Sequence, residues 1–315
     1  MSNSSSFIYK PFSEIVVDDL VYLFELDGKK VSKEYLLNKY LYSLSDKTAN
    51  FLGCIAYDNL GQPAAFVGGM PCLIKENNSV LKSVQIGDVI TNPLYRGKGL
   101  FVSTALYFFE HLRVNTSYDL IFAFPNEKSS PGFFNKMGWH KGSNFQLLNY
   151  TINMFNFYGL FHKFKFITPI YHFYTFLILK LVLRCNENNA GTTISNFHLV
   201  KNIDFLKYKE RYSDSAFIKL FGNHYFIKFL DGLQIDFVKV NSVKALQRDL
   251  RILSLLFGVK KFATFLTANS TIKDELLSAG FSIEKKTEWN TGFLFLHDAE
   301  RKEEFFFSIS DTDEF

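Results

Sequence analysis

The chain has 315 residues, of which 47% are hydrophobic and 21% are charged, with 18 glycines and 7 prolines. At roughly 150 residues per domain this length predicts two domains, and the composition excludes collagen-like, low-complexity and wholly disordered proteins. The formal net charge of +4 comes without a long run of one sign, so a nucleic-acid binder that depends on phosphate contacts is not indicated.

The three cysteines, Cys54, Cys72 and Cys185, are widely spaced along the chain. They show neither the spacing of a disulfide framework nor that of a metal site, and this pattern is typical of a reducing compartment. Residues 1–6 are mostly polar and show no apolar region of a signal peptide. We therefore expect a cytoplasmic protein without a metal ion.

The first half of the chain changes its hydrophobic period from helical to strand-like. A helix is predicted from Ser32 to Leu44, with Ser32 as its N-cap. Three strands joined by short turns, typical of an antiparallel meander, are expected at 51–57, 64–75 and 82–91. The next predicted elements are a helix over 99–113, a strand over 120–124 and a helix over 129–137 that ends at Gly138. A strand, a helix and a further strand in this order predict a right-handed parallel crossover.

A similar order of elements returns in the last third of the chain. Strands are predicted at 225–229, 233–240 and 261–267, and helices at 243–257 and 272–279. Gly280 and Phe281 end the last helix, as Gly138 and Trp139 end the corresponding helix of the first half. We therefore expect an internal repeat of the pattern, although not of the sequence itself.

Phe, Tyr and Trp make up 17% of the residues, and many of them lie in the middle of the chain. Residues 166–183 are mostly apolar but are interrupted by Pro169, His172 and Lys180, whereas a membrane span needs about 20 predominantly apolar residues. The segment fits a helix buried between two halves of the protein, an interfacial amphipathic helix or, least well, a true span. A peripheral membrane contact through residues 155–183 therefore stays open.

A glycine-rich loop lies directly before the predicted helix at 99–113. Gly97 and Gly99 allow the backbone to adopt positive φ and to approach a ligand closely. The free amides of the first helical turn and the helix dipole favour an anion at this point. The loop therefore predicts a pyrophosphate-binding site, although a glycine-rich loop alone also fits a tight strand-to-helix turn.

Two runs around this loop carry a resemblance to a known family. They are NPLYRGKGL, from Asn92 to Leu100, and FPNEKSSPGFFNKMGW, from Phe124 to Trp139. Both resemble the acetyl-CoA motif and its downstream partner in the GNAT superfamily of N-acetyltransferases. The resemblance implies an α/β (α+β) fold with a mixed sheet, in which an antiparallel meander, a parallel crossover and splayed central strands are followed by a degenerate second copy. The pantetheine arm of acetyl-CoA would lie in the gap between the splayed strands as an additional strand.

The resemblance also implies roles for individual residues. Ile90 and Thr91 would offer main-chain groups to pantetheine, and Asn126 would contact the cofactor arm unless it serves only an Asx turn. Lys98 would add charge at the pyrophosphate, although a solvated basic side chain is the equal alternative. The residues that would surround the pyrophosphate with backbone amides are Arg96, Gly97, Lys98, Gly99, Leu100 and Phe101.

Three positions depart from the family pattern. Phe101 stands where Gly or Ala is usual, and its ring must point into the core if the backbone is to bind phosphate. Val102 stands where Ser or Thr is frequent, so a hydroxyl contact would have to come from Ser103 or Thr104. Phe134 takes the place of a Tyr that often serves as general acid, and Phe cannot protonate a thiolate.

Asp88 is the candidate catalytic residue, acting as a general base for the acceptor amine. Strand alternation places it on the same face as Ile86 and Ile90, opposite Val89 and Thr91. Partial desolvation is expected to raise its pKa toward a useful value. The alternative is a surface or turn-stabilising carboxylate; His111 and His140 are secondary candidates for the base.

The predicted domains are an acetyl-CoA-binding domain over 1–150, an aromatic-rich helical connector over 151–195 and a degenerate copy without a glycine-rich loop over 196–315. The resemblance implies transfer of an acetyl group from acetyl-CoA to a small-molecule amine, with an amino sugar or nucleotide-linked sugar of surface polysaccharide synthesis as the expected acceptor. Two other classes stay open: a peptidyl transferase that uses aminoacyl-tRNA, and a non-catalytic acyl-CoA-binding module.

Overall fold

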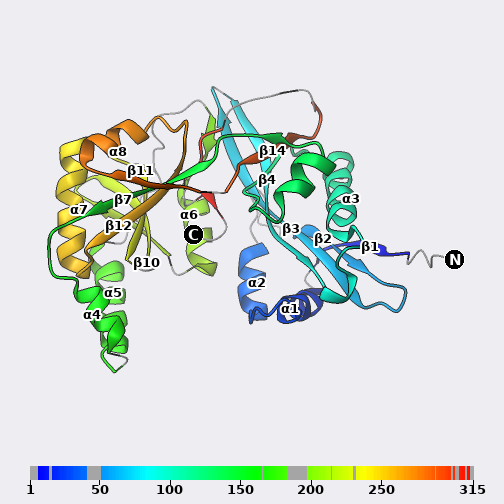
Figure 1. The fold of residues 1–315 in the computed structure, drawn as a ribbon, viewed down its shortest axis with the longest axis horizontal. Helices are drawn as coiled ribbons and strands as arrows, with labels where there is room; N and C mark the ends of the chain where they lie inside the picture. The colour runs from blue at the N-terminus through cyan, green and yellow to red at the C-terminus, as the bar shows by residue number, and fades with distance from the viewer. Residues whose placement is uncertain are drawn as a thin grey trace. The chain divides into compact units, whose positions relative to one another are not determined.

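The structure is a computed structural model that describes residues 6–13, 16–40, 51–77, 79–164, 166–183, 197–213, 215–229, 232–287, 289–298, 301, 305–308 and 311–312. The chain folds into two compact units (Figure 1). The first unit comprises Met1–Gly142 and Glu288–Glu304, and the second comprises Ser143–Thr287 and Phe305–Phe315.

The first unit is built on a mixed sheet with the strand order β1-β2-β3-β4-β5-β14-β6. Its strands are β1 (Ile8–Pro11), β2 (Leu52–Tyr57), β3 (Pro63–Glu76), β4 (Ser79–Thr91), β5 (Leu120–Ala123), β14 (Gly292–Phe295) and β6 (His140–Lys141). β2, β3 and β4 pair antiparallel, and β4 pairs parallel with β5. The predicted meander and parallel crossover are therefore confirmed.

Helices cover both faces of this sheet. They are α1 (Val17–Leu26), α2 (Lys33–Tyr40) and α3 (Leu100–Asn115), with short turns at η2 (Pro93–Tyr95) and η3 (Gly132–Lys136). On one face Tyr40 of α2 packs edge to face on Phe66 of β3, and on the other Phe108 of α3 lies in a cluster with Val84 of β4. Because both faces are covered, β2 is buried along its whole length and reads as an apolar run rather than an alternating one.

The predicted elements of this unit lie close to the observed ones. Ser32 Oγ accepts a hydrogen bond from the Tyr35 amide at 3.0 Å, as expected of an N-cap. The described part of the helix ends at Tyr40, and residues 41–44 of the prediction lie outside the described residues. The helix predicted over 129–137 is confirmed: residues 130–136 are helical, the last five of them as the π-helical turn η3, and Gly138 follows at a φ of +70°.

The second unit repeats the pattern around a sheet with the order β13-β7-β12-β11-β10-β9. Its strands are β13 (Ser282–Lys286), β7 (Phe145–Thr151), β12 (Lys261–Thr267), β11 (Leu233–Lys239), β10 (Asn223–Phe229) and β9 (Ser215–Leu220). The short strand β8 (Phe197–Leu199) lies outside this sheet. β11 and β12 pair parallel, whereas the other neighbours in this order pair antiparallel. The degenerate second copy is therefore confirmed at the level of the fold.

The helices of the second unit include a short hairpin that precedes the repeated pattern. They are α4 (Phe157–Lys163), α5 (Thr168–Leu177), η4 (Ile178–Leu183), α6 (Ile203–Tyr212), α7 (Val243–Phe257) and α8 (Lys273–Ala279). Ser242 Oγ caps α7 by accepting a hydrogen bond from the Ala245 amide at 3.2 Å, and Gly258 ends it at a φ of +61°. The helix therefore spans the predicted range, 243–257.

The two halves of the chain exchange one strand each. β14, from the end of the chain, inserts between β5 and β6 of the first unit. β7, which directly follows the first unit, inserts between β12 and β13 of the second. The units therefore differ from the predicted boundaries at 150 and 195, because pairing between strands far apart in sequence leaves no local pattern.

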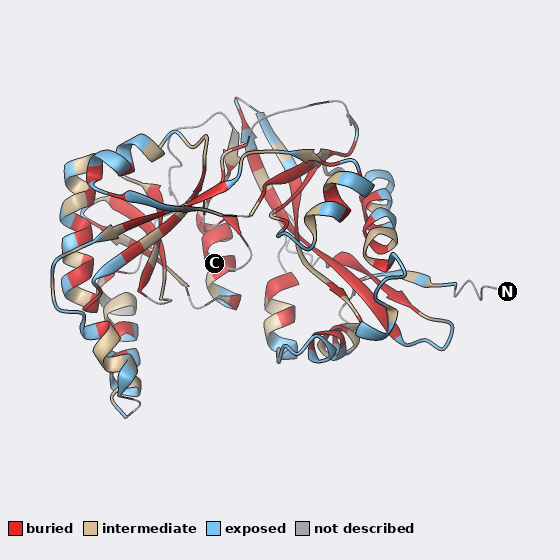
Figure 2. Ribbon diagram, viewed as in Figure 1, coloured by how far each residue is buried: buried red, intermediate tan, exposed pale blue. Residues whose placement is uncertain are grey.

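The predicted connector over 151–195 is not a separate domain in its described part. Tyr158 of α4, Tyr171 of α5 and Leu183 of η4 lie in the core cluster of the second unit. These helices pack on the second unit, and much of their surface is exposed (Figure 2). No helix in the described ranges has both the length and the apolar character needed to cross a membrane.

Candidate functional site

The central strands of the first unit part at one end. β4 and β5 pair from Ser83 with Leu120 to Ile86 with Ala123. β5 then ends, while β4 continues to Thr91 with β3 as its neighbour on the other side. Since no strand described in the structure pairs with this last part of β4 on the β5 side, its edge is available to an extended ligand. The predicted splayed strands are confirmed, with Ile90 and Thr91 on the open edge.

A β-bulge occurs in β4 where the strands part. Val67 pairs with Val89, and Gly69 pairs with Ile86, so the single residue between them in β3 faces both Gly87 and Asp88. An extra residue in one strand reverses its side-chain alternation from that point. Val89 therefore joins Ile86 on the α3 side, and the prediction that Ile86 shares a face with Asp88 is wrong.

Asp88 points toward α2 on the opposite face. Its Oδ2 accepts hydrogen bonds from Lys39 Nζ and from the Tyr40 hydroxyl, both at 2.7 Å. The Lys39 side chain is only 3% exposed and that of Asp88 15%, so the ion pair is largely shielded from water. Gly68 makes room for this contact, because a Cβ there would lie 2.6 Å from the Tyr40 hydroxyl oxygen.

The electrostatics of Asp88 differ from the sequence-based expectation. Burial by itself raises the pKa of the carboxyl group, but the charge and hydrogen bond of Lys39 and the hydrogen bond of Tyr40 outweigh it and lower the pKa below its ordinary value. The expected upward shift is therefore wrong. Asp88 is ionised at neutral pH, which suits it to hold a cation and makes it a weak proton acceptor.

The glycine-rich loop has the geometry of an anion site. Gly97 and Gly99 adopt φ values of +79° and +76°, and Gly99 is the N-cap of α3. The first hydrogen bond within the helix is donated by the Ser103 amide to the Gly99 carbonyl at 3.1 Å. The amides of the first turn that precede Ser103 therefore have no acceptor within the helix. No described atom lies within 4 Å of a Cβ built at either glycine, so the loop is open. The residues present therefore fit a pyrophosphate group.

The basic side chains of this loop have contacts of their own. Arg96 Nη2 pairs with Asp27 Oδ1 at 2.7 Å, which ties the loop to the end of α1. Lys98 Nζ lies 5.1 Å from the centre of the Tyr95 ring. The backbone amides and the helix dipole are thus the main features that the loop offers to an anion.

The bulky residue at the end of the loop does not obstruct it. Phe101 directs its ring toward the core, 5.2 Å from the Phe133 ring centre, and a Cβ at Gly132 would overlap it. The expectation of an inward ring is confirmed. Thr104 is fully buried, and Ser103 Oγ donates to the Leu100 carbonyl at 3.3 Å.

The far side of the gap carries Asn126 and Phe134. Asn126 Oδ1 accepts hydrogen bonds from the amides of Lys128 and Ser129, both at 3.1 Å, so its oxygen serves the Asx turn that the sequence also allowed. The Phe134 ring packs against Gly292 of β14, where a Cβ would lie 3.0 Å from it. A non-ionisable ring therefore lies beside the end of β5.

The two secondary candidates lie elsewhere in the first unit. His111 is on α3 twelve residues after Gly99, about 18 Å along the helix axis. His140 packs on Phe293 with ring centres 5.6 Å apart. The residues that contact Asp88 are instead Lys39 and Tyr40. The sequence pattern did not indicate them, because only the bulge in β4 turns Asp88 toward α2. Among the described residues no group of three or more His, Cys, Asp or Glu side chains could hold a metal ion.

The corresponding gap of the second unit is occupied by the chain itself. β11 and β12 pair parallel only at Leu233 with Phe262 and Gln234 with Ala263. Further along β12, the Phe307 carbonyl accepts a hydrogen bond from the Thr267 amide at 3.0 Å, and Ser308 pairs antiparallel with Leu266. The segment Phe305–Ser308 thus lies along β12 where β11 diverges from it.

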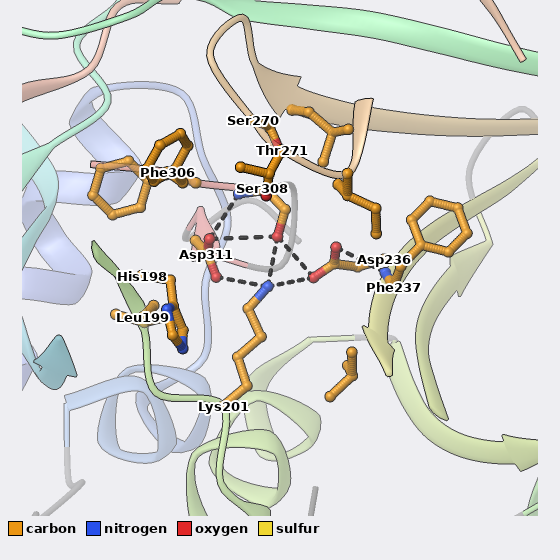
Figure 3. A pocket seen from close by; sticks show the side chains of 14 residues that line it. His198, Leu199, Lys201, Asp236, Phe237, Ser270, Thr271, Phe306, Ser308 and Asp311 are labelled. Carbon is orange, nitrogen blue, oxygen red and sulfur yellow. Dashed lines mark hydrogen bonds and ion pairs between the residues drawn. The ribbon is translucent and has the colours of Figure 1, made fainter. Parts of the chain in front are cut away.

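A buried polar cluster anchors this segment (Figure 3). Lys201 Nζ lies 2.6 Å from Asp236 Oδ2, 2.5 Å from Ser308 Oγ and 3.0 Å from Asp311 Oδ1. Burial lowers the pKa of Lys201, but the two carboxylates outweigh burial and raise it. Burial and the nearby Asp236 raise the pKa of Asp311 more than Lys201 lowers it. The cluster lines a small cavity of about 80 Å³ and ties the residues just before α6 to β11 and to the C-terminal segment.

No protein family model and no curated protein matches the sequence. Among solved structures, the chain is similar to a GCN5-related N-acetyltransferase from Anabaena variabilis, with a TM-score of 0.58 and 14% identity over 92% of this chain and 73% of that one. A GCN5-related N-acetyltransferase from Kribbella flavida gives a TM-score of 0.57 and 11% identity over 92% and 72% of the two chains. The chain thus has the fold of the GCN5-related N-acetyltransferases, as the resemblance implied.

A third similar structure is a GCN5-related glucosamine N-acetyltransferase region of a fungal multi-domain GH3 β-N-acetylglucosaminidase. Its TM-score is 0.51 and its identity 13%, over 93% of this chain and 38% of that one. The two-unit architecture thus recurs across nearly the whole length of this chain in proteins of very different sequence.

Proposed function

We propose that this protein transfers the acetyl group of acetyl-CoA to the primary amine of an amino sugar or nucleotide-linked sugar of surface polysaccharide synthesis. The observation that carries the proposal is the open loop with Gly97 and Gly99 in the left-handed conformation, at the start of α3 and beside the parting strands. The glucosamine acetyltransferase region with the same fold supports the choice of an amino sugar.

In this proposal the first unit holds acetyl-CoA through its backbone. The amides of Arg96 and Lys98 donate to the carbonyls of Pro93 and Tyr95, both at 3.4 Å. The pyrophosphate is therefore bound by the amides of Gly97, Gly99, Leu100 and Phe101, and the open edge at Ile90 and Thr91 binds pantetheine. Asn126 keeps its carboxamide nitrogen for the cofactor arm. Acetyl-CoA then supplies an activated thioester carbon within reach of the bulged part of β4.

Acetyl transfer forms a bond between the amine nitrogen and the acetyl carbon and breaks the carbon–sulfur bond. Asp88, ionised beside the bulge, binds and orients the acceptor amine. Because its pKa is low and Phe134 cannot donate a proton, water takes the amine proton and supplies the proton of the thiol. Alignment of the amine and the thioester then accounts for the acceleration.

The second unit contributes no second cofactor site in this proposal. Its gap already contains Phe305–Ser308, and the loop before α7 has no glycine-rich motif. Cys54 and Cys72 are buried and are not joined in a disulfide, which agrees with the reducing cytoplasm in which we place the protein.

Thermal-shift titration with acetyl-CoA, followed by a thiol-release assay, tests the function. We expect acetyl-CoA at 100 times its Kd to stabilise the protein by about 2.7 kcal/mol. Thiol release is expected with glucosamine or a nucleotide-linked amino sugar, but not with glucose as the matched control. Stabilisation without thiol release for any amine would favour a non-catalytic acyl-CoA-binding module, which the residue Phe134 allows.

If acetyl-CoA neither stabilises the protein nor releases thiol, the cofactor assignment fails. Binding of aminoacyl-tRNA in its place would then identify the peptidyl-transfer alternative.

A further inference from the structure

An aromatic surface covers the outer side of the hairpin formed by α4 and α5. In this segment eight large apolar side chains are between 42% and 75% exposed. They are Phe155, Phe157, Phe164, Phe166, Ile170, Phe173, Tyr174 and Phe176, and we call them the aromatic face. Single exposed apolar side chains are ordinary, but a gathering of this many in one short segment marks an interaction site.

The hairpin beneath this face is held firmly on the second unit. The hydroxyl groups of Tyr171 and Tyr174 donate to the carbonyls of Phe257 and Leu256 at the end of α7, at 2.8 and 2.9 Å. In α5 the buried residues are Tyr171 and Thr175, one turn apart, so a narrow stripe faces the core. A helix that is apolar on nearly all sides yet buries one stripe has an outer face suited to an apolar environment.

A pocket opens between the hairpin and the end of α7. Its volume is about 410 Å³, and its lining is almost wholly apolar, including Phe161, Ile167, Ile170 and Leu256. Leu255, which also lines the pocket, is 73% exposed. The volume is in the range of ligand pockets, about 300–1,000 Å³, and the lining suits a hydrocarbon chain.

The stretch of sequence that contains the aromatic face carries charge of one sign. It has no Asp or Glu between Glu127 and Glu187 but several Lys residues, of which the exposed Lys163 is the last residue of α4. Such a region complements an anionic lipid surface, to which each basic residue adds attraction. Protein–protein interfaces are instead depleted in Lys, which disfavours a protein partner here.

We propose that the aromatic face docks on an anionic lipid bilayer. Its aromatic rings enter the interface between headgroups and acyl chains, the pocket takes up a lipid acyl chain, and Lys163 contacts the headgroups. The hairpin lies on the membrane without crossing it. This inference does not depend on the proposed acetyl transfer.

Vesicle flotation tests the proposal with the full chain. The probes are vesicles of phosphatidylcholine alone and vesicles with an added third of phosphatidylglycerol. The test variant carries Phe155→Ser, Phe166→Ser and Phe173→Ser, whose side chains are 61%, 75% and 63% exposed. The matched control carries Leu60→Ser, Val80→Ser and Val114→Ser, which remove side chains of the first unit that are 86%, 54% and 68% exposed.

The protein and the control variant are expected to bind the anionic vesicles, and 1 M NaCl is expected to weaken binding because it reduces the Debye length to about 3 Å. The test variant is expected to bind about 1,000-fold more weakly, since each of the three Phe residues contributes roughly tenfold. Equal binding of both variants would overturn the proposal, as would a lack of vesicle binding. A different result is a lack of vesicle binding together with a dimer in sedimentation velocity that the control variant keeps and the test variant loses. That result would assign the aromatic face to a second copy of the chain.

Discussion

Replacement of Asp88 by Asn removes the charge that compensates Lys39. Lys39 Nζ and Asp88 Oδ2 lie 2.7 Å apart, and the Lys39 side chain is 3% exposed. The carboxamide oxygen of Asn can still accept one hydrogen bond, but the ammonium group of Lys39 then stays buried without its ion pair. We expect the first unit to lose stability although the shape of the side chain is preserved.

The expected loss is about 3 kcal/mol, at the lower end of the roughly 3–5 kcal/mol measured when one partner of a buried ion pair is removed. The lower end applies because the Asp88 side chain is 15% exposed. For a unit of this size, about 2–4 °C per kcal/mol predicts a decrease of about 6–12 °C in the thermal midpoint. The double variant Lys39→Met, Asp88→Asn removes both charges and is expected to recover most of this loss.

The pH dependence follows from the same ion pair. The pKa of Asp88 is lower in the folded state than its ordinary value, so ionised Asp88 stabilises the fold above that ordinary value. This contribution is lost as the pH falls below about 4 and through the folded-state pKa. The Asn variant is expected to show a smaller acid-induced loss of stability over the same range.

Urea unfolding between pH 2 and 7, with turnover and acetyl-CoA affinity measured in parallel, checks these expectations. We expect Asp88→Asn to lower turnover far more than it weakens acetyl-CoA binding. If its unfolding midpoint at pH 7 equals that of the unmodified protein, the argument from a buried ion pair is refuted. An unchanged turnover rate would remove Asp88 from the mechanism.

Gly99→Glu places a negative side chain in the loop and is expected to abolish stabilisation by acetyl-CoA, whereas Gly61→Glu, at another glycine with positive φ, keeps it; undiminished acetyl-CoA binding by Gly99→Glu would exclude the pyrophosphate site. Lys201→Met leaves two buried carboxylates without their cation and is expected to cost about 3–5 kcal/mol in urea unfolding. The exposed Lys207→Met serves as its control, and equal stability of the two would contradict the assignment of a buried cluster. Tyr171→Phe removes one hydrogen bond to the end of α7 and is expected to cost about 1 kcal/mol; no measurable change in the unfolding midpoint would show that this bond does not anchor the hairpin.

Local patterns were sufficient for most elements of both units. The helix at 243–257 begins at its Ser242 cap and ends at Gly258, and both signals are contained in adjacent residues. The loop from Arg96 to Phe101 could be predicted equally well, because positive φ at Gly97 and Gly99 and the start of a helix depend on nearest neighbours. The inward ring of Phe101 followed once a core was assumed behind the loop.

Asp88 shows why its surroundings could not be predicted in the same way. The bulge in β4 depends on a one-against-two register with β3, which no pattern within β4 records. That register turns Asp88 toward Lys39 and Tyr40, from a helix about fifty residues earlier. The sign of its pKa shift therefore depended on a tertiary contact, and desolvation alone predicted the wrong direction.

The length of the chain and the order of its predicted elements indicated two repeated units, and the glycine-rich loop predicted a phosphate site in the first of them. The tertiary structure decided the exchange of β7 and β14 and the position of Phe305–Ser308 in the second gap. It also decided that the aromatic segment buries only one stripe of α5. The physical reason is the range of the interactions: caps, turns and helical periods act between near neighbours, whereas sheet register, ion pairing and burial depend on residues brought together by folding.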